Sequence, residues 1–207
     1  MNKRKYYHQR RLDNDRKNRA ERVREKKEGR IEERRLHFLL KLMKQKGLTY
    51  AALGRLTGLS KQNLYHYFEL YDDMKLSQAE KICEKLGYLL SFTIRHKGRA
   101  ELRSPESSAM PAVLKAAALD PSCRLHELAV FLMTQEYSVA TFVRRTNIDR
   151  GMIYRPFRPD KDDISISGLL EIVSAMGYSV TFVLTKISGR GPSTIIVPAK
   201  RKVNNYK

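Results

Sequence analysis

The sequence predicts a mainly α-helical protein: two repeated modules, each of four short helices followed by a β-strand, behind a basic N-terminal arm. Three observations predict this fold class. Apolar residues recur at helical spacing between glycines, the chain repeats itself at a separation of 89 to 90 residues, and the first 35 residues carry few large apolar side chains. The expected domains are an arm at 1–35, a first module at 36–97, a linker at 98–124, a second module at 125–188, and a hairpin strand with a basic tail at 189–207.

The charge of the chain indicates a polyanionic partner. The 207 residues include 41 Lys and Arg against 22 Asp and Glu, a formal net charge of +19. Such an excess attracts polyanions at long range, so we expect nucleic acid as the partner rather than an anionic membrane surface. No apolar run approaches the roughly 18 residues of a membrane span, and no apolar stretch follows the basic start as in a secretory signal. We therefore expect a cytoplasmic protein.

The sequence contains no pattern typical of catalysis or metal binding. Cys83 and Cys123 lie far apart with no CxxC spacing, and the five histidines are scattered. There is no P-loop and no nucleophile elbow, and the pairs Asp72–Asp73 and Asp162–Asp163 are better explained as charges at helix N-termini. We expect no enzymatic activity, no cofactor and no metal, and we interpret both cysteines as buried, inert thiols.

The N-terminal arm is basic and cannot form a core. Residues 1–35 contain 15 Lys and Arg against 7 Asp and Glu. Two interpretations stay open: a solvated, frayed arm, or an arm that becomes helical on a phosphate backbone. The basic residues expected to add affinity are Lys3, Arg4, Lys5, Arg10, Arg11, Arg16, Lys17 and Arg19.

An internal repeat divides the rest of the chain. At an offset of 89 (125 − 36), identical residues coincide from Leu36 on Leu125 to Phe68 on Phe157. One inserted residue shifts the offset to 90, where Asp72–Asp73 meet Asp162–Asp163 and Phe92 meets Phe182. Because the register holds through both blocks, we interpret the two segments as copies of one module.

Helix start and stop signals define the elements of the first module. Apolar residues from Leu36 to Met43 predict a first helix that Gly47 ends, and the acidic pair at 72–73 precedes a fourth helix that stops at Gly87. Between them, Thr49 and Ser60 are expected to cap helices at 50–57 and 61–68, with Gly58 at the turn.

The apolar period changes to two after each fourth helix. Residues 88–94 and 178–184 alternate as in strands, and the second run continues through a turn at 188–191 into 194–197 as a hairpin. A lone strand would leave its backbone groups unpaired, so we expect the two strands to pair in one sheet. Pairing within the chain gives a pseudo-dimer, and pairing between chains gives a homodimer. The linker contains three prolines, with a short helix expected at 112–119.

Four residues of the first module are those a helix-turn-helix requires. Gly54 allows two helices to approach, Gly58 provides the turn, Leu59 plugs it, and Ser60 caps the next helix. In these positions the segment 48–65 resembles the Cro and phage-repressor class of DNA-binding domains. The resemblance covers nearly the whole first module, and it implies that the helix at 61–68 enters the major groove. It also implies a protein of a bacterial nucleoid or of a phage.

The resemblance assigns roles to residues of the first module. Lys61, Gln62 and His66 take the outward positions of the groove helix and are the expected base readers, since Gln suits adenine and Lys suits guanine. The expected phosphate contacts are Thr49, Tyr50 and Ser60, because helix N-termini present free N–H groups to anions.

The second module resembles the same class but departs from it in the groove helix. Asn147 replaces the turn glycine and Asp149 the cap, and Pro156 is expected to end the helix after about two turns. Either this is a shortened reader in which Arg150, Arg155 and Arg158 contact phosphate, or the module has become a structural partner. Both interpretations stay open.

Two functions follow from these features. The first is a DNA-binding transcriptional regulator with tandem helix-turn-helix modules, repressor-like, which reads specific sequences in the major groove. The alternative is a packaging or scaffold protein of a nucleoid, phage particle or ribonucleoprotein that binds the nucleic-acid backbone without specificity. We expect DNA rather than RNA as the partner.

Overall fold

The computed structural model describes residues 34–96, 112–134, 148–158, 161–188 and 194–198, together with single residues of the arm (Gln9, Leu12, Asp13, Arg16, Lys17, Ala20 and Arg24) and Val143 and Arg144. The chain forms two compact units, one of residues 1–74 with 200–207 and one of residues 75–199. The boundary between them lies inside the predicted first module. Each unit is described by itself.

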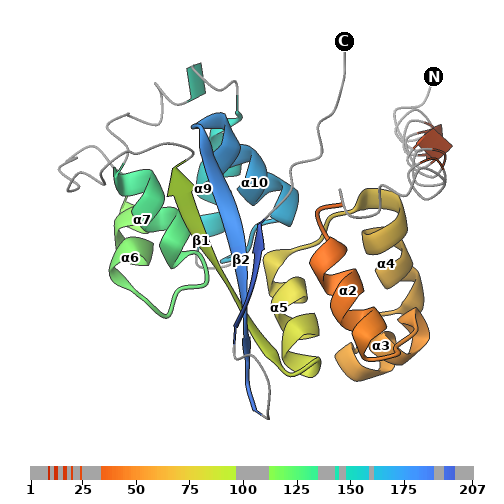
Figure 1. The fold of residues 1–207 in the computed structure, drawn as a ribbon. Helices are drawn as coiled ribbons and strands as arrows, with labels where there is room; N and C mark the ends of the chain where they lie inside the picture. Colours follow the sequence, from red (N-terminus) through yellow and green to blue (C-terminus); the bar gives the residue numbers. More distant parts are fainter. Residues whose placement is uncertain are drawn as a thin grey trace. The chain divides into compact units, whose positions relative to one another are not determined.

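The first unit contains a series of short helices (Figure 1). They are α2 at His37–Gln45, α3 at Tyr50–Thr57, α4 at Lys61–Tyr65 and a π-helix, η2, at His66–Tyr71. Their apolar faces supply the core of the unit, whose fully buried side chains include Leu36, Leu39, Leu53, Leu64 and Phe68. These residues recur at the spacing from which the helices were predicted.

The turn between α3 and α4 depends on two glycines. Gly58 ends α3 in the left-handed conformation, with φ of 70°, and its N–H bonds to the carbonyl of Gly54. A Cβ atom at Gly54 would lie 2.6 Å from the carbonyl oxygen of Leu59, a distance that real Cβ atoms do not show. The predicted role of Gly54, a close approach between two elements, is therefore confirmed.

The predicted groove helix at 61–68 differs from the structure. It is α-helical only for the five residues of α4 and then continues as a π-helix to Tyr71. A π-helix makes its turns wider by one residue, so residues after Tyr65 are rotated away from the positions of an ideal α-helix. The propensity pattern contains no signal for this change of hydrogen bonding, because both helix types use the same apolar spacing over one or two turns.

The second unit contains an antiparallel sheet and several helices (Figure 1). Helix α5 at Leu76–Lys85 leads into strand β1 at Tyr88–His96, and α10 at Ile166–Ala175 leads into β2 at Tyr178–Lys186. The remaining elements are α6 at Ala112–Leu119, α7 at His126–Thr134, α9 at Arg150–Tyr154, a 3-10 turn, η3, at Arg155–Phe157, and β3 at Thr194–Pro198.

The predicted pairing of the two strands is confirmed. Strands β1 and β2 are antiparallel with Phe92 opposite Phe182, and β3 adds to the other edge of β2, so the order is β1-β2-β3. Phe92, Val180, Phe182 and Leu184 are buried on one face. The pairing lies within one chain, so the sheet is complete without an exchange of strands. A homodimer stays a prediction.

Several elements of the second half have the bounds of an element of the first half, displaced by the repeat. Helices α2 and α7 differ by 89 residues, as do α4 and α9, whereas α5 and α10, and β1 and β2, differ by 90. Asp72 and Asp162 both have positive φ, at 49° and 25°. Pro156 is buried in η3, directly after the five-residue α9, so the groove helix of the second half is cut short as the proline predicts.

The cysteine environments are unequal. Cys83 is fully buried, and burial raises the pKa of its thiol to about 12, which confirms the expectation of an inert thiol. Cys123 is only half-buried, and its thiol donates a hydrogen bond to Asp162 over 3.5 Å. Among the described residues, no helix is long and apolar enough to cross a membrane.

Substitution of Gly54 by Ala tests the close approach in the turn. The added methyl group meets a backbone carbonyl, which cannot rotate away, so G54A is expected to lower the free energy of unfolding by about 1–3 kcal/mol. Urea denaturation measures this. The matched control is G168A, where a Cβ would meet only side-chain atoms at 3.2 Å or more and where Ala is the better helix former. An equal loss in both variants would contradict the packing role of Gly54.

Candidate nucleic-acid interface

Two capped helices build the helix-turn-helix of the first unit. The hydroxyl of Thr49 accepts the N–H of Ala52 over 3.2 Å, and that of Ser60 accepts the N–H of Asn63 over 3.0 Å. Both predicted caps are therefore confirmed. Each cap occupies the third amide of its helix, so the first amides of α3, including that of Tyr50, have no partner inside the helix and are oriented toward an incoming anion.

The first turn of α4 presents three polar side chains to solvent. Lys61, Gln62 and Asn63 are exposed, whereas Leu64 is fully buried and anchors the helix to the core. A positive charge beside two side chains that each donate and accept hydrogen bonds is the chemistry that recognises base edges. Lys61 and Gln62 were predicted as readers from the sequence. Asn63 was not, although an amide beside Gln62 was a signal for it.

His66 differs from the other two predicted readers. It is half-buried, because it lies where α4 becomes the π-helix, and its ring stands edge-on to Tyr71 with centroids 6.0 Å apart. Tyr65, interpreted from its recurrence as a packing residue, is 38% exposed. The change to π-helical geometry thus draws His66 toward the protein and leaves Tyr65 at the surface.

Tyr50 makes its side-chain contacts inside the protein. Its ring stacks on Phe68 with centroids 5.6 Å apart, and its hydroxyl donates to Glu69 over 2.8 Å. Burial, and then the hydrogen bond to Glu69, raise the pKa of Tyr50 above its ordinary value, so the phenol stays protonated as a donor. A phosphate contact at this residue would therefore come from its backbone N–H.

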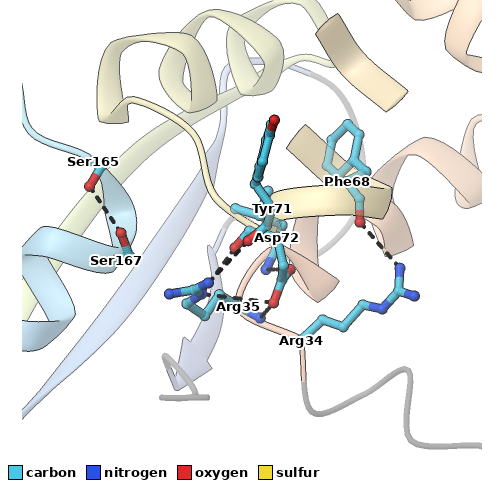
Figure 2. Close-up of polar contacts among 8 residues, drawn as sticks. Arg34, Arg35, Phe68, Tyr71, Asp72, Ser165 and Ser167 are labelled. Atoms are coloured by element: carbon cyan, nitrogen blue, oxygen red, sulfur yellow. Dashed lines mark hydrogen bonds and ion pairs between the residues drawn. The ribbon is translucent and has the colours of Figure 1, made fainter. Parts of the chain in front are cut away.

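The last two residues of the predicted arm belong to the folded unit. Figure 2 shows Arg34 and Arg35 directed at the end of η2. Arg34 is buried and donates to the carbonyl of Phe68 over 3.3 Å, with Glu69 at 3.5 Å. Arg35 donates to the carbonyls of Tyr71 and Asp72 over 3.1 and 3.0 Å. The solvated arm predicted for 1–35 is therefore wrong at its end, because the apolar pattern gives no signal for a buried arginine.

Most other arm residues lie outside the described part of the chain. Among the expected affinity residues, Arg16 and Lys17 are helical and exposed. The others, Lys3, Arg4, Lys5, Arg10, Arg11 and Arg19, are not described. Gln9 donates to Asp13 over 3.1 Å, a pairing four residues apart that is typical of a helix.

The corresponding helix of the second half exposes charge without amides. Arg150, Arg155 and Arg158 are all exposed, and the guanidinium of Arg150 lies 5.3 Å from the centroid of the Tyr154 ring. At the offset of 89, the residues that correspond to Gln62 and Asn63 are Gly151 and Met152. Neither has a side chain that can hydrogen-bond a base edge, so this helix retains cations and lacks readers.

Metal chemistry has no ligand set in the described residues. No group of three or more His, Cys, Asp or Glu side chains lies close enough together there to hold an ion. The site therefore consists of hydrogen-bonding and charged groups on a helix-turn-helix, which can recognise a nucleic acid by its backbone and base edges.

Comparison with protein families matches this part of the chain. Residues 39–88, from α2 to the first residue of β1, match the family of the Cro/C1-type HTH DNA-binding domain. These residues are a Cro/C1-type HTH DNA-binding domain. The match covers about a quarter of the chain and does not include residues 125–188, so it does not support a second copy there. Comparison with curated proteins and with solved structures gave no match.

The Cro/C1-type domain gives the chain a DNA-binding role of the kind found in transcription regulators. It places α4, with Lys61, Gln62 and Asn63, at the position of the recognition helix. The resemblance stated from the sequence is thus confirmed for the first module.

Proposed function

We propose that the protein is a sequence-specific transcriptional regulator that reads the major groove with α4. The observation that carries this proposal is the trio Lys61, Gln62 and Asn63, exposed at the start of the recognition helix of a Cro/C1-type domain. Gln and Asn can each make two hydrogen bonds to adenine, and Lys donates to the acceptors of guanine. His66 is the fourth candidate reader, from its half-buried position one turn later.

Contacts to phosphate would fix this helix in the groove. The free amides at the start of α3, at Tyr50, and the caps Thr49 and Ser60 are the proposed backbone contacts of the domain. The basic arm adds electrostatic affinity that does not depend on sequence. These roles make the partner duplex DNA rather than RNA, because the deep, narrow major groove of an RNA duplex does not admit a helix.

The second half is proposed to be a degenerate copy that contacts the DNA backbone. The equal displacement of element bounds and the shared positive φ of Asp72 and Asp162 support a common origin. Its shortened helix keeps Arg150, Arg155 and Arg158 at the surface and has lost the amide side chains, which favours phosphate contacts over base reading. A single chain would then contact two neighbouring stretches of one duplex without forming a homodimer through its strands.

A packaging or scaffold role is the second candidate. The net charge of +19 and the arginines of the second half favour binding to a nucleic-acid backbone in general, as in a bacterial nucleoid or a phage particle. Both functions place the protein in the cytoplasm. They differ in whether the readers of α4 discriminate between sequences, and this difference decides the experiments below.

Substitution of Gln62 by Ala separates the two functions. On the preferred duplex, Q62A is expected to cost about 1–3 kcal/mol of binding free energy, and on random duplex little, because only a base contact depends on sequence. Fluorescence anisotropy with both duplexes measures the difference. Q45A is the matched control, since Gln45 is an exposed amide at the end of α2. Equal losses for Q62A on both duplexes would favour the packaging role.

Removal of the arm tests its electrostatic role. A chain without residues 1–33 is expected to bind all duplexes more weakly and to show a smaller dependence of log K on log salt, since each neutralised phosphate contributes a slope of about −0.9. Titrations at four salt concentrations measure the slope. An unchanged slope would mean that the arm is directed at another partner, such as a protein.

Neutralisation of the second half tests its proposed phosphate contacts. The double variant R150Q/R155Q is expected to weaken binding by the same factor on preferred and random duplexes and to reduce the salt slope by one to two phosphates' worth, about 0.9 each. The control K81Q/K85Q removes the same charge from exposed positions on α5. If both pairs have the same effect, the arginines act only through net charge, and the contact is refuted.

A further inference from the structure

Three side chains connect the end of the arm to the start of α3. Glu69 lies between the other two: one of its carboxylate oxygens accepts the hydroxyl of Tyr50 over 2.8 Å, and the other lies 3.5 Å from the guanidinium of Arg34. Arg34 also donates to the carbonyl of Phe68, and the Tyr50 ring stacks on the Phe68 ring. We call Arg34, Glu69 and Tyr50 the arm network.

The arm network is shielded from water. The side chain of Arg34 is 1% exposed and that of Glu69 is 14% exposed. Ion pairs at the surface contribute little, but a pair held in the interior has a fixed geometry, because separation would leave a charge buried without compensation. The direction in which the chain leaves the fold at residue 34 is therefore set by Glu69.

The second half of the chain provides an internal comparison. The contact of Arg35 with the carbonyl of Asp72 is repeated there, since Arg124 donates to the carbonyl of Asp162 over 2.6 Å. The residues that correspond to Arg34, Tyr50 and Glu69 are instead Cys123, Val139 and Arg158, which cannot form the same network. The arginine–aspartate contact thus belongs to the shared fold, whereas the arm network occurs only in the half that carries the arm.

We propose that the arm network is a positioning device that couples the basic arm to the DNA-binding face of the Cro/C1-type domain. The inference rests on the proposed function, because it concerns how the same site holds its duplex. Arg34 is the last but one residue of the arm, and Tyr50 is the first residue of α3, where the backbone amides meet phosphate. A fixed exit restricts the arm to the neighbourhood of the duplex, which raises its effective concentration and reduces the ordering cost of binding.

The test measures the coupling between the arm network and the arm charges in the full chain. E69Q is combined with an arm in which Arg10, Arg11, Arg16 and Lys17 are replaced by Gln, and the affinity for a random duplex is measured for all four combinations. E69Q removes a negative charge, so its charge effect alone would strengthen DNA binding. We expect instead a loss of roughly three- to tenfold with the native arm and less than twofold with the neutralised arm.

Two further variants keep the test independent of folding. Y50F removes only the hydroxyl that Glu69 holds and retains the stacked ring, and it should repeat the coupling of E69Q. E80Q is the matched control, because it breaks an arginine–glutamate pair of the second unit, Arg124 to Glu80 at 2.6 Å, with the same change of net charge. All measurements are made well below the melting temperatures, which circular dichroism gives for each variant.

The outcomes decide the inference separately from the proposed function. Equal losses for E69Q with both arms, or no loss with the native arm, would overturn the coupling, as would coupling of the same size for E80Q. The preference for one sequence over random duplex decides the regulator role and does not enter this cycle. A wild-type chain that binds no duplex at any salt concentration would overturn both.

Discussion

The carboxylate of Asp72 closes the first unit, and the position of the recognition helix depends on it. Its two oxygens accept the backbone N–H groups of Arg35 and Leu36 over 2.9 and 3.1 Å, while Arg35 in turn donates to the carbonyls of Tyr71 and Asp72. Asp72 is fully buried, and its positive φ turns the chain out of η2. These contacts join the residue before α2 to the residue after the helix that carries the readers.

This closure explains how a short recognition helix can be held in place. Helix α4 has only five residues, too few for stability on its own. It is fixed at its start by the Ser60 cap, along its length by Leu64 in the core, and beyond its end by the contacts of η2 with Arg34 and Arg35. The exposed side chains of the first turn are thereby presented on a rigid base, which is a requirement for discrimination between bases.

The two halves of the chain combine one fold with different surface chemistry. Both have an aspartate with positive φ before a helix and strand, and both place an arginine on the carbonyl of that aspartate. The first half carries amides on its groove helix, whereas the second carries arginines and a proline. In the second half Arg124 also pairs with Glu80 of α5, and burial raises the pKa of that carboxyl while the arginine opposes the shift.

Local signals allowed much of this architecture to be predicted from the sequence. Caps at Thr49 and Ser60 and the turn at Gly58 depend on neighbouring residues only, and the strands follow from alternation. The antiparallel pairing followed from the need to satisfy backbone groups. The π-helix, the burial of Arg34 and the Tyr50–Glu69 contact could not be predicted, because each depends on groups 19 to 35 residues apart or on a hydrogen-bonding pattern without its own sequence signal.

The same limit applies to the candidate site. Lys61 and Gln62 were found because the helix-turn-helix spacing defines which positions face outward. His66 was expected beside them, but the π-helix rotates it toward Tyr71. Asn63 is exposed in the same turn, and its position at the third residue of the helix was assigned to capping geometry rather than to reading.

Selection from a random duplex library at physiological salt, with an RNA duplex of the same length as competitor, tests the central claim most directly. If α4 reads the major groove, the wild-type chain enriches a short common DNA motif, the RNA competitor does not displace it, and the Q62A chain enriches a motif changed at one position. Enrichment of no motif, or displacement by RNA as effective as by DNA, would contradict the account.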